Sequence, residues 1–202
     1  MANIYLIGPM GAGKSTVART LAAQLGWDWT DTDLEVEAAA GRPIPAIFAA
    51  EGEEGFRRRE EEALARVAER DGLVVATGGG IVLRPVNRER MRRTGWVVYL
   101  TAPPEVLWRR LTLGHGVSDR PLLRGEDGQA RLAALVAARE PLYQEVADLV
   151  VDTRDRGPAE VAAIIARWLA AEDRGLDEKA RGPRHQAREP GDKGKGLGDE
   201  GA

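Results

Sequence analysis

The chain has 202 residues, of which 43% are hydrophobic and 30% are charged, and its formal net charge at pH 7 is −3. This composition is typical of one globular domain with a buried core, and it gives no reason to expect nucleic-acid binding. The chain contains no cysteine, which excludes disulfides, thiolate metal sites and thiol catalysis. No apolar run is long enough to span a membrane and no secretory signal is visible, so we expect a cytoplasmic protein without a membrane partner.

Short apolar runs alternate with segments of helical periodicity along residues 1–172. The expected strands are Asn3–Ile7, Trp27–Thr30, Leu73–Ala76, Trp96–Leu100 and Leu149–Val151. The expected helices are Thr16–Leu25, Asp33–Ala40, Glu53–Arg70, Arg84–Arg93, Pro104–Leu111, Gln129–Gln144 and Pro158–Glu172. This alternation predicts an α/β fold in which helices flank a parallel five-stranded sheet. In such a fold the binding site lies beyond the carboxyl ends of the strands.

The first strand runs into the segment 8–15, which reads Gly-Pro-Met-Gly-Ala-Gly-Lys-Ser. The spacing Gly-x4-Gly-Lys-Ser between a strand and a helix predicts a phosphate-binding loop. Its glycines let successive backbone N–H groups face one anion, and the following helix points its partially positive end at the same place. Lys14 is expected to contact the β- and γ-phosphates, and the Ser15 hydroxyl is placed to ligate Mg²⁺. The chain is therefore predicted to bind a nucleoside triphosphate.

Two aspartates, Asp31 and Asp33, follow the second expected strand. We expect Thr32 to cap the next helix and Glu35 to reach back to it as a capping box, an arrangement that does not require two aspartates. Asp31, at the strand end, could hold a water on Mg²⁺. Asp33, in the first helical turn, is a candidate to orient an acceptor hydroxyl and take its proton, and a purely capping role is the alternative.

Two arginines stand where a helix would be expected to present apolar side chains. Arg57 follows Phe56 near the start of one expected helix, with Glu60 close enough to orient its guanidinium, and Arg139 interrupts the apolar stripe of another. Each arginine either extends its charged end to solvent at the rim of the core or faces a cleft, and the pattern alone does not decide between these readings. Two fixed guanidinium groups on one cleft would select a small carboxylate.

Two loops also have the composition of functional segments. The third strand ends in Gly78-Gly79-Gly80, which exposes backbone N–H groups for close approach of a ligand, although a flexible turn is the alternative. The segment 112–125 is glycine-containing and weakly periodic, as a closing lid would be, and its Arg120 could stabilise a phosphoryl group in transfer. Residues 173–202 are charged and rich in glycine, and we expect them to form a disordered tail.

Taken together, these motifs resemble the shikimate kinase family, which belongs to the nucleoside-monophosphate-kinase type of P-loop NTPase folds. The resemblance runs from Ile4 to Ala170. It rests on Gly8–Ser15, Asp31-Thr32-Asp33, Gly52-Glu53-x-x-Phe56-Arg57, Gly78-Gly79-Gly80, Arg120-Pro121-Leu122-Leu123 and Arg139-x-Pro141-Leu142-Tyr143. It implies a kinase domain over 1–172, with a substrate-binding segment at about 32–62 and a lid at about 112–125.

The resemblance implies a monomer that phosphorylates the 3-hydroxyl of shikimate with ATP and Mg²⁺ in aromatic amino-acid biosynthesis. Asp33 would hold the shikimate hydroxyls, Arg57 and Arg139 its carboxylate, and Gly79 would contribute a backbone contact. Lys14 and Arg120 would neutralise the moving phosphoryl group, with Ser15 on Mg²⁺ and Asp31 supporting the ion through water. The residues that would bind ATP are Gly11, Ala12, Gly13, Lys14, Ser15 and Thr16 at the phosphates, and Arg110 and Arg156 at the adenine.

Three other functions compete with this interpretation. A gluconate-type sugar-acid kinase would share the phosphate loop and differ in its acceptor. A nucleotide-switched regulator of the GTPase class would need an Asn-Lys-x-Asp motif, which neither Asn3 nor Asn87 supplies. A catalytically silent nucleotide-binding module is disfavoured because the predicted catalytic and substrate-binding residues are all retained.

Overall fold

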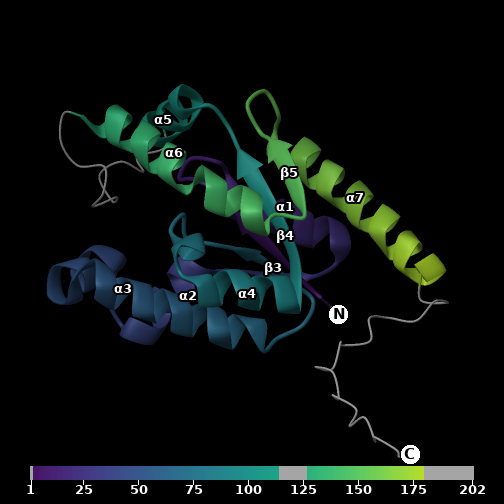
Figure 1. The fold of residues 1–202 in the computed structure, drawn as a ribbon, viewed down its shortest axis with the longest axis horizontal. Coiled ribbons are helices and arrows are strands. Elements are labelled where there is room, and N and C mark those ends of the chain that lie inside the picture. The colour runs from purple at the N-terminus through teal and green to yellow at the C-terminus, as the bar shows by residue number, and fades with distance from the viewer. Residues whose placement is uncertain (1, 114–126, 180–202) are drawn as a thin grey trace, which may run out of the picture. The chain divides into compact units, whose positions relative to one another are not determined.

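The structure is a computed structural model that describes residues 2–113 and 127–179 (Figure 1). Its strands are β1 Asn3–Ile7, β2 Asp28–Asp31, β3 Leu73–Ala76, β4 Gly95–Thr101 and β5 Leu149–Asp152. Its α-helices are α1 Lys14–Leu25, α2 Thr32–Ala40, α3 Ile44–Ala68, α4 Pro85–Thr94, α5 Pro104–Leu113, α6 Gly128–Val146 and α7 Pro158–Lys179, and the short 3₁₀ helix η1 covers Ile81–Leu83. All five expected strands are present, and β1 and β3 have the predicted bounds.

The strands form one sheet in the order β2-β3-β1-β4-β5, and every neighbouring pair is parallel. β1 lies at the centre, where Ile4 pairs with Val74 of β3 and with Trp96 of β4. The predicted α/β fold with a five-stranded parallel sheet is confirmed. Because parallel strands all end at the same edge, the residues that follow β1, β2 and β3 are brought together there.

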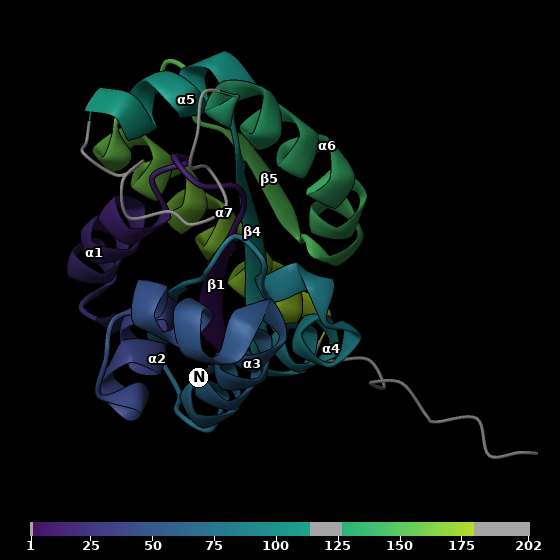
Figure 2. The same ribbon diagram turned by 90° about the vertical axis from the view of Figure 1, so that its left-hand side faces the viewer.

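The central strands β1 and β3 are buried on both faces of the sheet, as their continuous apolar runs require. On one face, Tyr5, Val75 and Tyr99 pack in a core with side chains of α3, α4 and α6. On the other face, Leu6 of β1 is equally buried, and α1 packs against β2 and β3. Figure 2 shows α1 and α6 on opposite sides of β1 and β4. The two layers of helices hold the carboxyl edge of the sheet in a fixed position.

Helix α3 is two helical segments joined at Gly52. The backbone of Gly52 has φ 69° and ψ −174°, a conformation open essentially to glycine alone. The helix that the sequence predicts to begin at Glu53 is the second segment, and the first runs from Ile44 with Pro43 as its N-cap. Across the kink, Arg59 Nε donates to Glu51 Oε2 at 2.9 Å, which ties the two segments together.

The C-terminal region differs from its prediction. The chain divides into a unit Met1–Arg167, which holds the sheet, and a unit from Trp168 onward. Helix α7 continues to Lys179, so residues 173–179 of the expected disordered tail are helical, and the remainder of that tail lies outside the described residues. Among the helices of residues 2–113 and 127–179, none has the length and apolar character needed to cross a bilayer.

Candidate active site

The segment after β1 folds into a tight loop that only glycines permit at two positions. Gly8 has φ 136°, and a Cβ placed there would lie 2.2 Å from the carbonyl oxygen of Leu100. Gly11 has φ 82°, and its Cβ would lie 2.7 Å from the carbonyl oxygen of Leu107. Gly13, also at positive φ, is the N-cap of α1, which begins at the predicted lysine rather than at Thr16. The N-terminal end of α1 therefore points into the loop, as phosphate binding requires.

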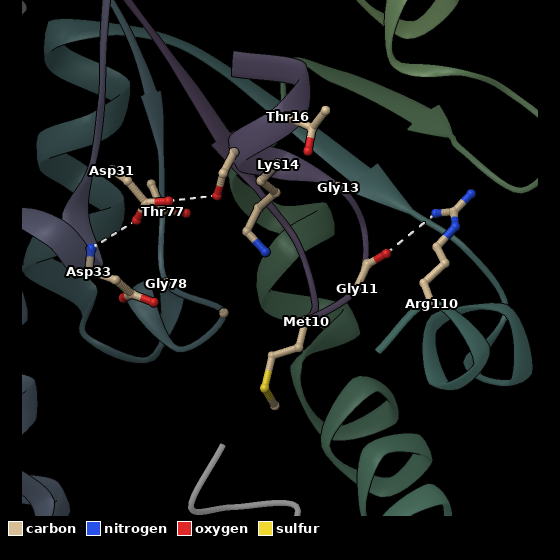
Figure 3. Close-up of a pocket in the computed structure, with 12 residues that line it drawn as sticks. Met10, Gly11, Gly13, Lys14, Thr16, Asp31, Asp33, Thr77, Gly78 and Arg110 are labelled. Carbon is tan, nitrogen blue, oxygen red and sulfur yellow. Dashed lines mark hydrogen bonds between the residues drawn. The ribbon is translucent and has the colours of Figure 1, made fainter. Parts of the chain in front are cut away.

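Lys14 lies at the centre of this site (Figure 3), and Ser15 follows it at the start of α1. The Lys14 ammonium donates to the carbonyl oxygens of Gly8 and Pro9, each at 2.8 Å, and its side chain extends over the loop. The Ser15 hydroxyl donates to Asp31 Oδ2 at 2.6 Å. A hydroxyl and a carboxylate oxygen beside a phosphate loop suit Mg²⁺, which takes few protein ligands and completes its shell with water and phosphate oxygens.

The start of α2 is capped differently from the prediction. Asp31 is the N-cap, and its Oδ1 accepts from the backbone N–H of Asp33 at 2.9 Å. The expected capping box of Thr32 and Glu35 is wrong, because the Thr32 hydroxyl instead accepts from the N–H of Gly78 at 3.0 Å. Thr32 is buried against the neighbouring strand end, where this bond joins the acidic turn to the glycine triplet. Asp31 thus caps the helix with one oxygen and contacts Ser15 with the other.

The glycine triplet 78–80 brings the acid and the first arginine together. A Cβ on Gly78 would lie 2.8 Å from Asp33 Oδ1, and a Cβ on Gly80 would lie 2.2 Å from Arg57 Nη1. Three successive positions without side chains therefore let a carboxylate and a guanidinium approach the backbone closely. The predicted convergence of Asp33 and Arg57 on this turn is present in the structure.

Arg139 reaches the same turn from helix α6. Its side chain is buried, and its Nη1 donates to the carbonyl oxygen of Gly79 at 3.3 Å. This contact decides between the two interpretations of the interrupted apolar stripe, since the guanidinium points inward to the triplet rather than out to solvent. Arg57 and Arg139 approach the triplet from different helices, so two buried guanidiniums lie at the glycine triplet that also contacts Asp33.

The guanidinium of Arg57 is held by a buried carboxylate, as the sequence spacing predicted. Arg57 Nη1 donates to Glu60 Oε2 at 2.6 Å, and Glu53 accepts a longer bond at 3.3 Å. Glu60 is fully buried, and its second oxygen, Oε1, makes no hydrogen bond in the described structure. Burial raises the pKa of Glu60 to about 7, against the opposing effect of Arg57, and the nearby Asp33 carboxylate adds to the rise.

This shifted pKa predicts a pH dependence of stability. An unfolded chain loses the Glu60 proton near pH 4.5, whereas the folded chain keeps it until about pH 7. The free energy of unfolding therefore falls as pH rises between these values, by up to about 3 kcal/mol. Denaturant unfolding of wild type and Glu60→Gln from pH 4.5 to pH 8 should show the wild type losing stability relative to the variant. A pH-independent difference would contradict a raised pKa.

The close approach at Gly80 predicts that a single methyl group displaces the Arg57 guanidinium. In Gly80→Ala the new Cβ would meet three atoms of the Arg57 guanidinium within 2.4 Å, so this side chain must move. We expect the KM for the acceptor to rise by roughly ten- to hundredfold, with the KM for the nucleotide unchanged. Gly157→Ala is the matched control, because nothing lies within 4 Å of its Cβ position. An unchanged KM for the acceptor in Gly80→Ala would show that the position of the Arg57 guanidinium beside Gly80 is not needed for acceptor binding.

A cavity of about 300 Å³ opens at this edge of the sheet and joins the phosphate loop to the acidic turn. Its lining residues are Met10, Gly11, Gly13, Lys14, Ser15, Thr16, Asp31, Asp33, Thr77, Gly78, Gly79 and Arg110. Most of the predicted site residues are therefore gathered on one hollow, which Figure 3 shows with Asp31 and Asp33 on one side and Gly11 and Arg110 on the other. Three predicted site residues, Ala12, Arg57 and Arg139, are buried and are not among the residues that line this cavity.

The two arginines expected at the adenine lie in different surroundings. Arg110 lines the cavity, donates to the carbonyl oxygen of Gly11 at 3.4 Å, and bonds the Thr153 hydroxyl at 2.9 Å. Arg156 is exposed, pairs with Glu160 at 3.2 Å, and is not among the cavity residues. Arg120 and the rest of the predicted lid beyond Leu113 lie outside the described residues.

A phosphate loop on a parallel sheet of this order, with an acidic turn and two buried arginines beside it, is the arrangement of a P-loop kinase of small molecules. A family model described as shikimate kinase matches residues 10–170. A curated shikimate kinase of Symbiobacterium thermophilum is 53% identical over 167 residues, which are 83% of this chain and 95% of that protein. The chain belongs to the shikimate kinase family and is a phosphotransferase.

Solved structures agree with this assignment. A shikimate kinase from Acinetobacter baumannii in complex with shikimate is 42% identical, with a TM-score of 0.81 over 85% of this chain and 94% of that one. A gluconokinase from Sinorhizobium meliloti aligns with a TM-score of 0.57 over 88% of this chain and 97% of that one. Its sequence identity is 18%, so this second likeness concerns the fold alone.

Proposed function

We propose that this chain transfers the γ-phosphate of ATP to the 3-hydroxyl of shikimate, giving shikimate 3-phosphate for aromatic amino-acid biosynthesis. The observation that carries the proposal is the convergence of Asp33, Arg57 and Arg139 on the glycine triplet beside the phosphate loop. A cyclic acid with vicinal hydroxyls matches this set, because its carboxylate pairs with the guanidiniums while its hydroxyls face the aspartate. The relative from Acinetobacter baumannii, solved with shikimate, supports the same acceptor.

The phosphate loop would hold ATP through its backbone N–H groups, from Gly11 to Thr16, and through the positive end of α1. Lys14 would leave the carbonyl oxygens of Gly8 and Pro9 and contact the β- and γ-phosphates. Arg110 would lie beside the base, at the wall of the cavity that it already lines. For Arg156 and Arg120 the proposal rests on the family resemblance, with Arg156 at the adenine and Arg120 at the moving phosphoryl group.

Mg²⁺ would be held by Ser15 and, through a water, by Asp31. The two side-chain oxygens lie 2.6 Å apart at the phosphate loop, and both are hard ligands of the kind that Mg²⁺ prefers. Among the described residues no cluster of three or more acidic or histidine side chains forms a complete metal site by itself. This fits an ion that arrives with the nucleotide. When bound, Mg²⁺ would neutralise phosphate charge.

The side chains would contribute to the transfer by orienting the acceptor and by stabilising the charge on the phosphoryl group. Arg57 and Arg139 would fix the carboxylate of the acceptor, which sets the ring so that one hydroxyl faces the γ-phosphate. Asp33 would orient this hydroxyl and accept its proton as the hydroxyl oxygen bonds to the γ-phosphorus and the bond from phosphorus to the bridging oxygen of the departing ADP breaks. Lys14 would stabilise the charge on the phosphoryl oxygens. The backbone N–H of Gly79 would add a contact to the substrate. No covalent intermediate is needed.

A panel of acceptors tests the proposal against its competitors. Coupled ADP release is measured with shikimate, gluconate and other small hydroxy acids at saturating Mg-ATP. We expect turnover with shikimate at about 1–100 s⁻¹ and little with the others. Turnover with gluconate alone would favour a sugar-acid kinase, and ATP binding without turnover on any acceptor would favour a silent module. Mass spectrometry of the product identifies the phosphorylated hydroxyl.

We also propose that the active form is a cytoplasmic monomer. The proposed mechanism assigns no role to a residue from a second copy of the chain. A cytoplasmic location fits the supply of ATP. Light scattering after size-exclusion chromatography measures the mass in solution, and a dimer would contradict the proposed state.

A further inference from the structure

Tyr143 and Arg139 lie one turn apart on α6, and both donate to the same backbone atom, the carbonyl oxygen of Gly79. Arg139 Nη1 makes the longer bond, at 3.3 Å, and the Tyr143 hydroxyl makes the shorter one. At 3.3 Å the bond from the guanidinium is longer than is usual for N–H···O, so Arg139 is a weak donor to a carbonyl that also accepts from Tyr143. Both residues belong to the Arg-x-Pro-Leu-Tyr motif, yet the proposed mechanism gives Tyr143 no role.

The Tyr143 ring is held firmly in place. It is fully buried and stacks on Tyr99 of β4, with ring centroids 4.9 Å apart and planes inclined by 22°. Tyr99 is fixed in turn, because its hydroxyl donates to the Glu140 carboxylate and lies 3.2 Å from the Thr101 hydroxyl, from which it can accept. Burial also raises the pKa of Tyr143 to about 12, so that its hydroxyl carries a proton throughout the neutral range.

We infer that Tyr143 is a positioning residue: its hydroxyl satisfies the Gly79 carbonyl, which releases the Arg139 guanidinium to bind the carboxylate of the acceptor. This inference rests on the proposed function, because it needs Arg139 to be a carboxylate ligand. A half-buried carbonyl that loses its donor carries a desolvation cost. With Tyr143 in place, Arg139 can turn from Gly79 to the substrate and leave the carbonyl still bonded.

Removal of the hydroxyl changes this arrangement without changing the packing. In Tyr143→Phe the ring still stacks on Tyr99, and Arg139 becomes the donor on which the Gly79 carbonyl depends. Binding of the carboxylate then draws the guanidinium away from the carbonyl, so the cost of the broken bond appears in the affinity for shikimate. The phosphate loop is not involved, and the KM for ATP should stay at the wild-type value.

The first measurement compares Tyr143→Phe with Tyr5→Phe. Tyr5 is also fully buried, and its hydroxyl bonds Thr94 Oγ1 at 2.7 Å, so its variant loses a similar hydrogen bond away from the site. By calorimetry and steady-state kinetics, we expect Tyr143→Phe to weaken shikimate binding by roughly three- to tenfold. The KM for ATP should not change, and Tyr5→Phe should match the wild type in both. An unaltered shikimate affinity, or a joint loss of shikimate and ATP binding through general unfolding, would overturn the inference.

The second measurement asks whether Tyr143 acts through Arg139. In an Arg139→Ala background there is no guanidinium to release, so adding Tyr143→Phe should leave the affinity for shikimate unchanged. A merely structural tyrosine would give the same loss in both backgrounds and would overturn the inference. Assay of the wild-type enzyme with shikimate separates a failure of the proposed function from a failure of the role inferred for Tyr143. If the enzyme does not phosphorylate shikimate, the proposed function fails, whereas normal wild-type turnover with an unaffected Tyr143→Phe refutes only the role of Tyr143.

Discussion

Asp33→Asn is expected to lose a factor of about 10²–10⁴ in kcat for shikimate phosphorylation while it folds like the wild type. Asparagine has nearly the same shape but accepts no proton at neutral pH, so the acceptor hydroxyl would be oriented without being deprotonated. The start of α2 should survive the change, because Asp31 supplies the cap and position 33 contributes only its backbone N–H to that bond. The loss should therefore appear in turnover rather than in stability.

Coupled ADP release at saturating ATP and shikimate measures this loss, and thermal unfolding checks the fold. Asp28→Asn is the matched control, since Asp28 is an exposed aspartate at the start of β2, the strand whose other end leads into the acidic turn. It should turn over like the wild type. Turnover near the wild-type rate in Asp33→Asn would exclude this carboxylate as the base and leave it at most a structural role in the acidic turn.

The features that the sequence predicted well depend on residues that are close together in the chain. β1 and β3 have the expected bounds because continuous apolar runs fit strands that are buried on both faces. The phosphate loop was predictable because strand, glycines, lysine and helix are contiguous. Even the break in α3 left a local signal, since Gly52 precedes the residue at which the helix was expected to begin.

The features that the sequence did not predict depend on distant partners. Thr32 was read as a helix cap because such threonines usually bond the local backbone, but its partner is Gly78, 46 positions away. The inward direction of Arg139 depends on a carbonyl 60 positions away. The same is true of Tyr143, whose apolar ring explains its place on the helix without indicating a bond from its hydroxyl. Sequence spacing reports a shared helix face but not what lies opposite that face.

The second large effect is expected at the two buried arginines, which have different partners in the fold. Arg57 pairs with the carboxylate of Glu60, whereas Arg139 donates a long bond to a backbone carbonyl. Arg139→Ala is expected to weaken shikimate binding by roughly 2–5 kcal/mol, since a desolvated carboxylate would lose one of its two cations. Stability should change little. The Gly79 carbonyl, to which Arg139 donates, keeps its bond from Tyr143. Calorimetry with shikimate, together with denaturant unfolding, measures both quantities, and wild-type affinity in Arg139→Ala would remove this residue from the site.

Arg57→Ala is the informative comparison, because it should lose affinity to a similar extent and stability as well. Its partner Glu60 is fully buried, so removing the guanidinium leaves a carboxylate without its cation, at a cost of about 3–5 kcal/mol when that carboxylate is ionised. Protonation of Glu60 relieves the cost, and the stability deficit of Arg57→Ala should therefore shrink as pH falls from 8 to 5. If both arginine variants lost a similar amount of stability at every pH, the loss in Arg57→Ala could not be attributed to an unpaired Glu60 carboxylate. A loss of stability confined to Arg57→Ala would show that Arg57 contributes to folding as well as to carboxylate binding. Arg139 would then serve carboxylate binding alone.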